Sequence, residues 1–213
     1  MAGLVFDYVG ATADRFAATP SFTLNLRISD VDGSRIEALA LRCQIRIEPH
    51  RRRYSDDEAD RLRDLFGERE RWADTLKPVQ VATVPTMVPG FTGSTTHELP
   101  VPCGYDLEVA CTKYFDALSD GEIPLLLLYS GTVFRTNDGR FAVQQVPWSA
   151  ETAFGLPVSV YRETIDVHYP NRAWVPVQRE TLASLRRFKS DHALPTWDST
   201  LAALLAAAAQ PKS

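Results

Sequence analysis

Alternating apolar and polar residues mark the clearest strands of the sequence. Residues 22–28 and 39–48 each alternate with a period of two, so that one set of side chains is apolar and the other is polar. Successive side chains of a strand point to opposite faces, and this pattern therefore predicts antiparallel strands with one buried and one solvated face. Turn-forming residues 30–33 separate the two segments. We expect the two strands to pair as neighbours.

Three further segments read as strands. Residues 99–115 have apolar side chains at most odd-numbered positions and predict the longest strand. Pro100 and Pro102 lie in its first half, where we expect a bulge or an edge position. The apolar run 123–128, continuing to residue 134, predicts a central strand buried on both faces. Asn-Asp-Gly at 137–139 predicts a hairpin into a returning strand over 141–146. Residues 1–20 are expected to form an irregular lead-in.

Helical signals lie in an insertion and at the end of the chain. Ser55 and Glu58 have the spacing of a capping box, which predicts a helix up to Gly67, and a second short helix is expected over 68–76 with Trp72 facing inward. Further helices are expected from residue 157, from about residue 182, and after an N-cap at Thr196.

Val79, Val81 and Val84 suggest a brief strand, and an apolar stretch at residues 85–96 lies between it and the strand predicted over 99–115. Two prolines and two glycines predict a loop here, yet the stretch contains Met87, Val88 and Phe91. Loops usually run over the surface, so such a loop either folds back onto the core or contacts a partner.

These elements together predict the fold class. We expect an α+β protein, mainly an antiparallel β-sheet or sandwich, with C-terminal helices and a helical insertion. The length of 213 residues fits a single domain over 1–213, with a β-rich part at 20–150 and a helical part at 156–209.

Composition narrows the setting of the protein. The net charge of −4 gives no reason to expect a nucleic-acid partner, and no apolar run is long enough to predict membrane insertion. The start of the chain lacks the pattern of a signal peptide, and three cysteines without a C-x-x-C pair fit buried, reduced side chains. We therefore expect a cytoplasmic protein.

One concentrated basic run precedes the helical insertion. It spans His50 to Tyr54 and contains Arg51, Arg52 and Arg53, and it is followed by the acidic residues Asp56, Asp57, Glu58 and Asp60. The run is either a solvated turn whose charge is offset by these neighbours or a contact for an acidic protein surface.

No motif in the sequence indicates catalysis. Ser130 does not lie in a G-x-S-x-G elbow, the four histidines are scattered, and no glycine-rich phosphate loop is present. We expect no cofactor and no metal site.

Several segments carry a resemblance to a known family. They are residues 42–49 (RCQIRIEP), 87–95 (MVPGFTGST), 121–128 (GEIPLLLL) running into 130–134 (SGTVF), 146–148 (VPW) and 194–198 (LPTWD). With these, the chain resembles an actinobacterial domain family of unknown function that is encoded near genes for nickel–iron uptake hydrogenases. The resemblance implies a role near hydrogenase maturation or organisation, and it implies no functional residues. The order of long strands followed by a Leu-Pro-opened helix is also similar to the export chaperone SecB, which would fit a client-binding role.

The sequence thus favours a non-enzymatic accessory or assembly protein that binds a protein partner. The candidate partner-binding residues are Met87, Val88, Phe91, Arg51, Arg52 and Arg53. Two other classes stay open, a structural subunit of a larger complex or homo-oligomer, and an enzyme with an unrecognised site.

Overall fold

The computed structural model describes residues 3–103, 109–137, 140–170 and 177–209. The chain divides into two compact units, residues 1–171 and 172–213, which are described separately below. The single domain over 1–213 that the sequence favours stays a prediction.

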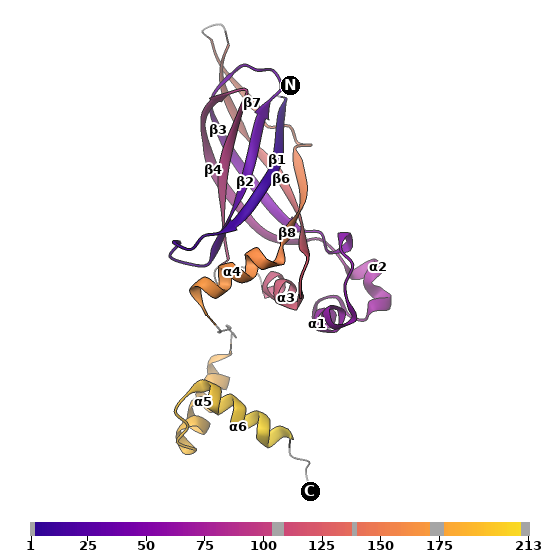
Figure 1. The fold of residues 1–213 in the computed structure, drawn as a ribbon, viewed down its shortest axis with the longest axis vertical. Helices are drawn as coiled ribbons and strands as arrows, with labels where there is room; N and C mark the ends of the chain where they lie inside the picture. The colour runs from indigo at the N-terminus through magenta and orange to yellow at the C-terminus, as the bar shows by residue number, and fades with distance from the viewer. Residues whose placement is uncertain (1–2, 104–108, 138–139, 171–176, 210–213) are drawn as a thin grey trace. The chain divides into compact units, whose positions relative to one another are not determined.

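The first unit contains two antiparallel sheets in its described residues (Figure 1). One sheet has the order β1-β2-β5, formed by β1 (Leu4–Ala13), β2 (Ser21–Asp30) and β5 (Ser94–Pro102). The other has the order β4-β3-β6-β7 with β8 also paired to β6, formed by β3 (Arg35–Ile47), β4 (Val79–Thr92), β6 (Glu122–Asn137), β7 (Arg140–Gln145) and β8 (Glu151–Pro157). With the helices described below, this confirms the predicted α+β class.

A single hydrophobic core contains side chains from both sheets. The alternation read from the sequence is confirmed, because the apolar set of β3 is buried, namely Leu39, Leu41, Cys43, Ile45 and Ile47. The chain passes from one sheet to the other at Gly93, which alone separates β4 from β5 and has a φ of 74°. Glycine reaches this left-handed conformation without steric cost, which allows so short a connection.

The predicted pairing of the first two strands is wrong. β2 pairs with β1 and β5, whereas β3 pairs with β4 and β6. A strand with one apolar face is equally compatible with a neighbour in the same sheet and with a strand across the core. Here the turn after Asp30 carries the chain into the second sheet.

Two strands went unrecognised in the sequence. Residues 4–13 form β1 instead of an irregular lead-in, and residues 151–157 form β8. Both contain a short alternation of apolar and other residues. Leu4 and Phe6 of β1 and Leu156 of β8 are buried in the core, and Phe154 of β8 packs against it.

The predicted loop over residues 85–96 is also wrong, because β4 and β5 occupy nearly all of it. Within the described residues, both strands lie at sheet edges and pair on one side only. Proline lacks an N–H donor, and an edge strand tolerates it where that N–H would face away from the sheet. Pro85 and Pro89 are therefore compatible with a regular strand.

The predicted strand over 99–115 ends early. β5 stops at Pro102, and residues 109–117 form helix α3 (Val109–Ala117). Residues 104–108 lie outside the described part of the chain. Cys43, Cys103 and Cys111 are all buried.

Helices of the first unit gather at one end of the strands (Figure 1). They are η1 (Pro49–Arg51), α1 (Asp56–Phe66), η2 (Arg69–Arg71), α2 (Trp72–Thr75), α3 and α4 (Val158–His168). The capping box of Ser55 and Glu58 is confirmed, and Trp72 is buried as predicted.

A buried ion pair joins the two sheets. Arg135 of β6 and Asp30 of β2 are 1% and 0% exposed at their side chains. Arg135 Nη1 donates to Asp30 Oδ2 at 2.9 Å, and Nη2 donates to Asp30 Oδ1 at 2.6 Å. Hydrogen bonding to Arg135 and the backbone N–H of Ser34 outweighs the opposing effect of burial and lowers the pKa of Asp30.

The second unit contains α5 (Arg179–Asp191) and α6 (Trp197–Ala209) among its described residues. Thr196 caps α6 as predicted, because its Oγ1 accepts the backbone N–H of Ser199 at 3.0 Å. The sequence also favours a short extended piece over 174–177, and its first three residues lie outside the described part of the chain.

Candidate functional site

The three apolar residues of the predicted loop lie in β4, where they separate into two sets. Val88 and Phe91 are buried in the core between the sheets. Met87 is 59% exposed and lies on the opposite, outer face of its sheet. Of the three, only Met87 is therefore available to a partner.

Met87 belongs to an apolar surface that crosses four strands. The register aligns Pro89 of β4, Ala38 of β3, Phe134 of β6 and Val143 of β7 in one row. We call this surface the outer-face strip; it consists of Ala38, Met87, Pro89, Phe134, Phe141 and Val143. Phe141 and Val143 are 67% and 55% exposed, and the Phe141 ring stacks on Phe134 with centroids 6.0 Å apart.

A shallow hollow of about 650 Å³ lies next to the strip. Its lining consists of Ala40, Leu41, Arg42, Pro85, Thr86, Met87, Ser130, Gly131 and Gln145. Arg42 is exposed here, and the described residues provide no ion pair to it. The strip and the hollow together offer apolar contact area with the Arg42 guanidinium at its margin, which is an arrangement suited to contact with a protein surface.

The family comparison places the whole chain in one group. A family model described as a family of unknown function (DUF6084) matches residues 1–213. The chain belongs to this family. A search of the curated proteins found no match. The DUF6084 assignment carries no residue roles, so the site rests on geometry.

In this DUF6084 chain the three arginines of the basic run do not form one surface. Arg51 and Arg53 are exposed, whereas the Arg52 side chain is only 11% exposed. Arg52 Nη2 donates to Glu58 Oε1 at 2.6 Å, and Nη1 donates to the carbonyl of Glu122 at 2.7 Å. Arg52 thus joins the helical insertion to the start of β6, and a partner has direct access to Arg51 and Arg53 alone.

Glu58 is the centre of this junction. It accepts the backbone N–H groups of Ser119 at 2.8 Å and Ser55 at 3.1 Å in addition to Arg52. Burial by itself would raise the pKa of Glu58, but these hydrogen bonds and the Arg52 charge together hold it below its ordinary value of 4.5.

Acid should therefore weaken the DUF6084 fold through Glu58 and Asp30. Both carboxyl groups have a lower pKa folded than unfolded, so their contribution is complete above their ordinary values of 4.5 and 3.8 and is lost as the pH falls through the folded values. We expect Glu58→Gln to lower the free energy of unfolding by about 2 kcal/mol at neutral pH. The difference from wild type should shrink on acidification, as measured by urea unfolding across this pH range.

The exposed Glu163, which pairs with Arg15, provides a matched control. Glu163→Gln should change the free energy of unfolding by no more than about 0.5 kcal/mol at any pH, as is usual for surface pairs. Equal effects of the two substitutions would contradict the assigned role of Glu58.

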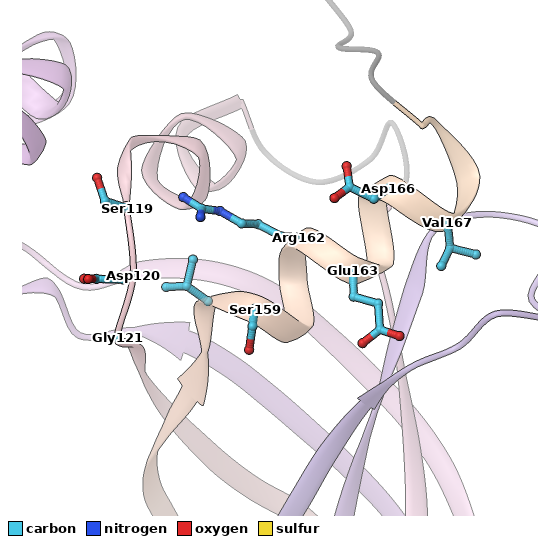
Figure 2. A pocket seen from close by; sticks show the side chains of 9 residues that line it. Ser119, Asp120, Gly121, Ser159, Arg162, Glu163, Asp166 and Val167 are labelled. Carbon is cyan, nitrogen blue, oxygen red and sulfur yellow. The ribbon is translucent and has the colours of Figure 1, made fainter.

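A second hollow, of about 570 Å³, lies beside α4 (Figure 2). Arg162 extends toward the segment before β6 and donates to the carbonyl of Leu118 at 2.7 Å, and Glu163 pairs with Arg15. No histidine or cysteine lines this hollow. The two engaged side chains stabilise the position of α4, and the hollow contains no nucleophile paired with a base.

The described residues contain no group of three or more His, Cys, Asp or Glu side chains placed to hold a metal ion. No helix among them is both long enough and apolar enough to cross a bilayer.

Sequence reasoning missed most of the outer-face strip. It identified Met87, but it treated Phe141 and Val143 only as members of a strand. The available signal was their shared parity, since residues 141 and 143 project from the same face of β7. That this face is exposed depends on strand order, which the sequence alone does not specify.

Proposed function

We propose that this protein is a non-enzymatic accessory protein that binds a protein partner through the outer-face strip. The observation that carries the proposal is the high exposure of Met87, Phe141 and Val143 on one continuous sheet face. Exposed apolar residues that occur singly are normal, whereas a contiguous set surrounded by polar residues is typical of an interaction site. Polar neighbours such as Arg42 and Gln145 supply such a rim.

The proposed setting is the cytoplasmic assembly or maturation of a nickel–iron uptake hydrogenase. Its support is the family resemblance of the sequence, and the strip supplies the surface that such a role needs. Binding of an unfolded client, as the similarity to SecB suggests, would use the same apolar surface.

Partner capture with altered strips tests the proposal. We expect the wild-type protein to retain a hydrogenase subunit or maturation factor from its native host. The double variant Met87→Ser/Phe141→Ser should retain at least about tenfold less of this partner, because each substitution removes exposed apolar area that the partner would cover. Quantitative mass spectrometry after affinity purification measures the retained amount.

The matched control is Val5→Ser/Val9→Ser, which removes exposed apolar side chains from β1 in the other sheet. This variant should retain the partner as the wild type does, and equal urea midpoints would show that both variants are folded. Capture of a partner that is unaffected by the strip substitutions would rule out the strip as the binding surface. Absence of every hydrogenase component would rule out the hydrogenase setting.

A further inference from the structure

The edge of β7 is open in the described part of the chain. β6 pairs with β3 along one side, and its other side is shared by β8, over residues 122–128, and by β7, over residues 132–137. β7 is therefore held by β6 alone, with no described strand on its far side.

The hydrogen-bond pattern shows which backbone groups face that open edge. The N–H of Val146 donates to the carbonyl of Gly131 on β6 at 2.9 Å. Backbone groups of a strand alternate in direction, so the even-numbered residues of β7 bond to β6. The N–H and C=O groups of Phe141, Val143 and Gln145 consequently point to the open edge, and the described residues offer them no backbone partner.

Three other edge strands in the described part of the chain, β1, β4 and β5, are protected. β4 contains Pro85 and Pro89, and β5 contains Pro100 and Pro102. β1 has a bulge between Tyr8 and Gly10, and Thr152 Oγ1 donates to the carbonyl of Phe6 at 2.6 Å. Prolines, bulges and covering groups are the usual means of preventing unwanted strand pairing.

β7 has none of these protections. Between Phe141 and Gln145 it has no proline, no charged residue and no register shift, and Phe141 and Val143 add exposed apolar side chains to the open backbone. The contrast with β1, β4 and β5 indicates an edge that is kept free for pairing.

We propose that β7 pairs antiparallel with β7 of a second copy of this chain, with Val143 on the twofold axis. This register places Phe141 opposite Gln145 of the other copy and brings the open groups of both strands together in about six backbone hydrogen bonds. Arg140 lies opposite Val146, so no like charges meet. The pairing also places the two outer-face strips side by side on one continuous sheet, which favours a second copy over an unrelated extended peptide.

The inference goes beyond the proposed function, because it concerns the edge of β7 and partner binding concerns the face of the sheet. A monomeric protein that still captured its partner through Met87 would overturn the pairing and leave the proposed function intact.

A charge-complementation experiment on the full-length chain tests the pairing and its register. Wild-type protein should be a dimer at micromolar concentration by analytical ultracentrifugation. Val143→Lys and Val143→Glu should each raise the dimer dissociation constant at least about tenfold, because equal charges would face each other across the axis. Mixing the two variants should restore dimers, since lysine then faces glutamate.

Both variants should fold, because Val143 is largely exposed, and equal urea midpoints check this. A monomeric wild type would overturn the proposal, as would dimers that persist in both single variants or a mixture that stays monomeric. An extended apolar peptide that bound a monomeric wild type but not Val143→Pro would assign the edge to a foreign strand and would equally overturn it.

Discussion

Replacing Arg135 by methionine should lower the free energy of unfolding by about 3–5 kcal/mol, the usual cost of removing one partner of a buried ion pair. The substitution leaves the Asp30 carboxylate buried and without its cation. Asp30 belongs to β2 and Arg135 to β6, so the loss also removes a direct link between the two sheets. Urea unfolding at neutral pH, followed by circular dichroism, measures the change.

The acid dependence of this variant identifies the cause. Without Arg135, burial is the largest remaining influence on the pKa of Asp30 and acts to raise it, so we expect protonation to be more favourable in the folded variant than in the folded wild type. Stability that depends on a raised folded pKa is present at low pH and is lost as the pH rises through that value. The deficit of Arg135→Met should therefore be smaller in mild acid than at neutral pH. Asp30→Asn/Arg135→Met should recover part of the loss at neutral pH, because it removes the buried charge.

Arg35 provides the control, since it pairs with Glu37 at 3.1 Å on the surface. Arg35→Met should change the free energy of unfolding by no more than about 0.5 kcal/mol. A loss of similar size for Arg35→Met and Arg135→Met would show that burial of the pair is not what makes Arg135 important.

The sequence was informative where one physical requirement dominates a segment. The apolar set of β3 has to enter the core, and Ser55 with Glu58 can satisfy the free N–H groups at the start of a helix. Each of these patterns is local, and the structure confirms each one. The hairpin predicted from residues 137–139 rests on an equally local pattern, and the pairing of β6 with β7 agrees with it.

The sequence was misleading where strand order decides. Pro85 and Pro89 suggest a loop until β4 is known to be an edge strand. Arg135 shares the parity of the buried Val133. A charged side chain is rarely buried without a partner, however, and its partner Asp30 is more than a hundred residues away in the sequence. The outer-face strip depends on strand order for the same reason, because its residues come from four strands.

Replacing Gly131 by alanine should lower the free energy of unfolding by at least about 3 kcal/mol, from steric overlap and backbone strain together. A Cβ at this position would lie 2.1 Å from the carbonyl oxygen of Ala40 in β3, and the φ of 153° is rarely adopted by other residues. Gly131 lies where β6 changes partner, after its pairing with β8 ends at Leu128 and before its pairing with β7 begins at Thr132. The substitution should therefore also disturb β7.

Gly10 provides the matched control for this prediction. It lies in β1, and an added Cβ would have nothing within 4 Å. Gly10→Ala should leave stability unchanged or raise it by about 0.5 kcal/mol, because alanine restricts the unfolded chain more than glycine does.

Hydrogen exchange gives a second measurement of the Gly131→Ala variant. Relative to the wild type, exchange should accelerate more at the even-numbered amides of β7, which bond to β6, than at the amides of β2 in the other sheet. If Gly131→Ala matched Gly10→Ala in stability, the close approach of β6 to Ala40 would not be a constraint on the fold. In that case, some contact other than the approach of Gly131 to Ala40 would have to hold β6 and the open edge of β7 in position.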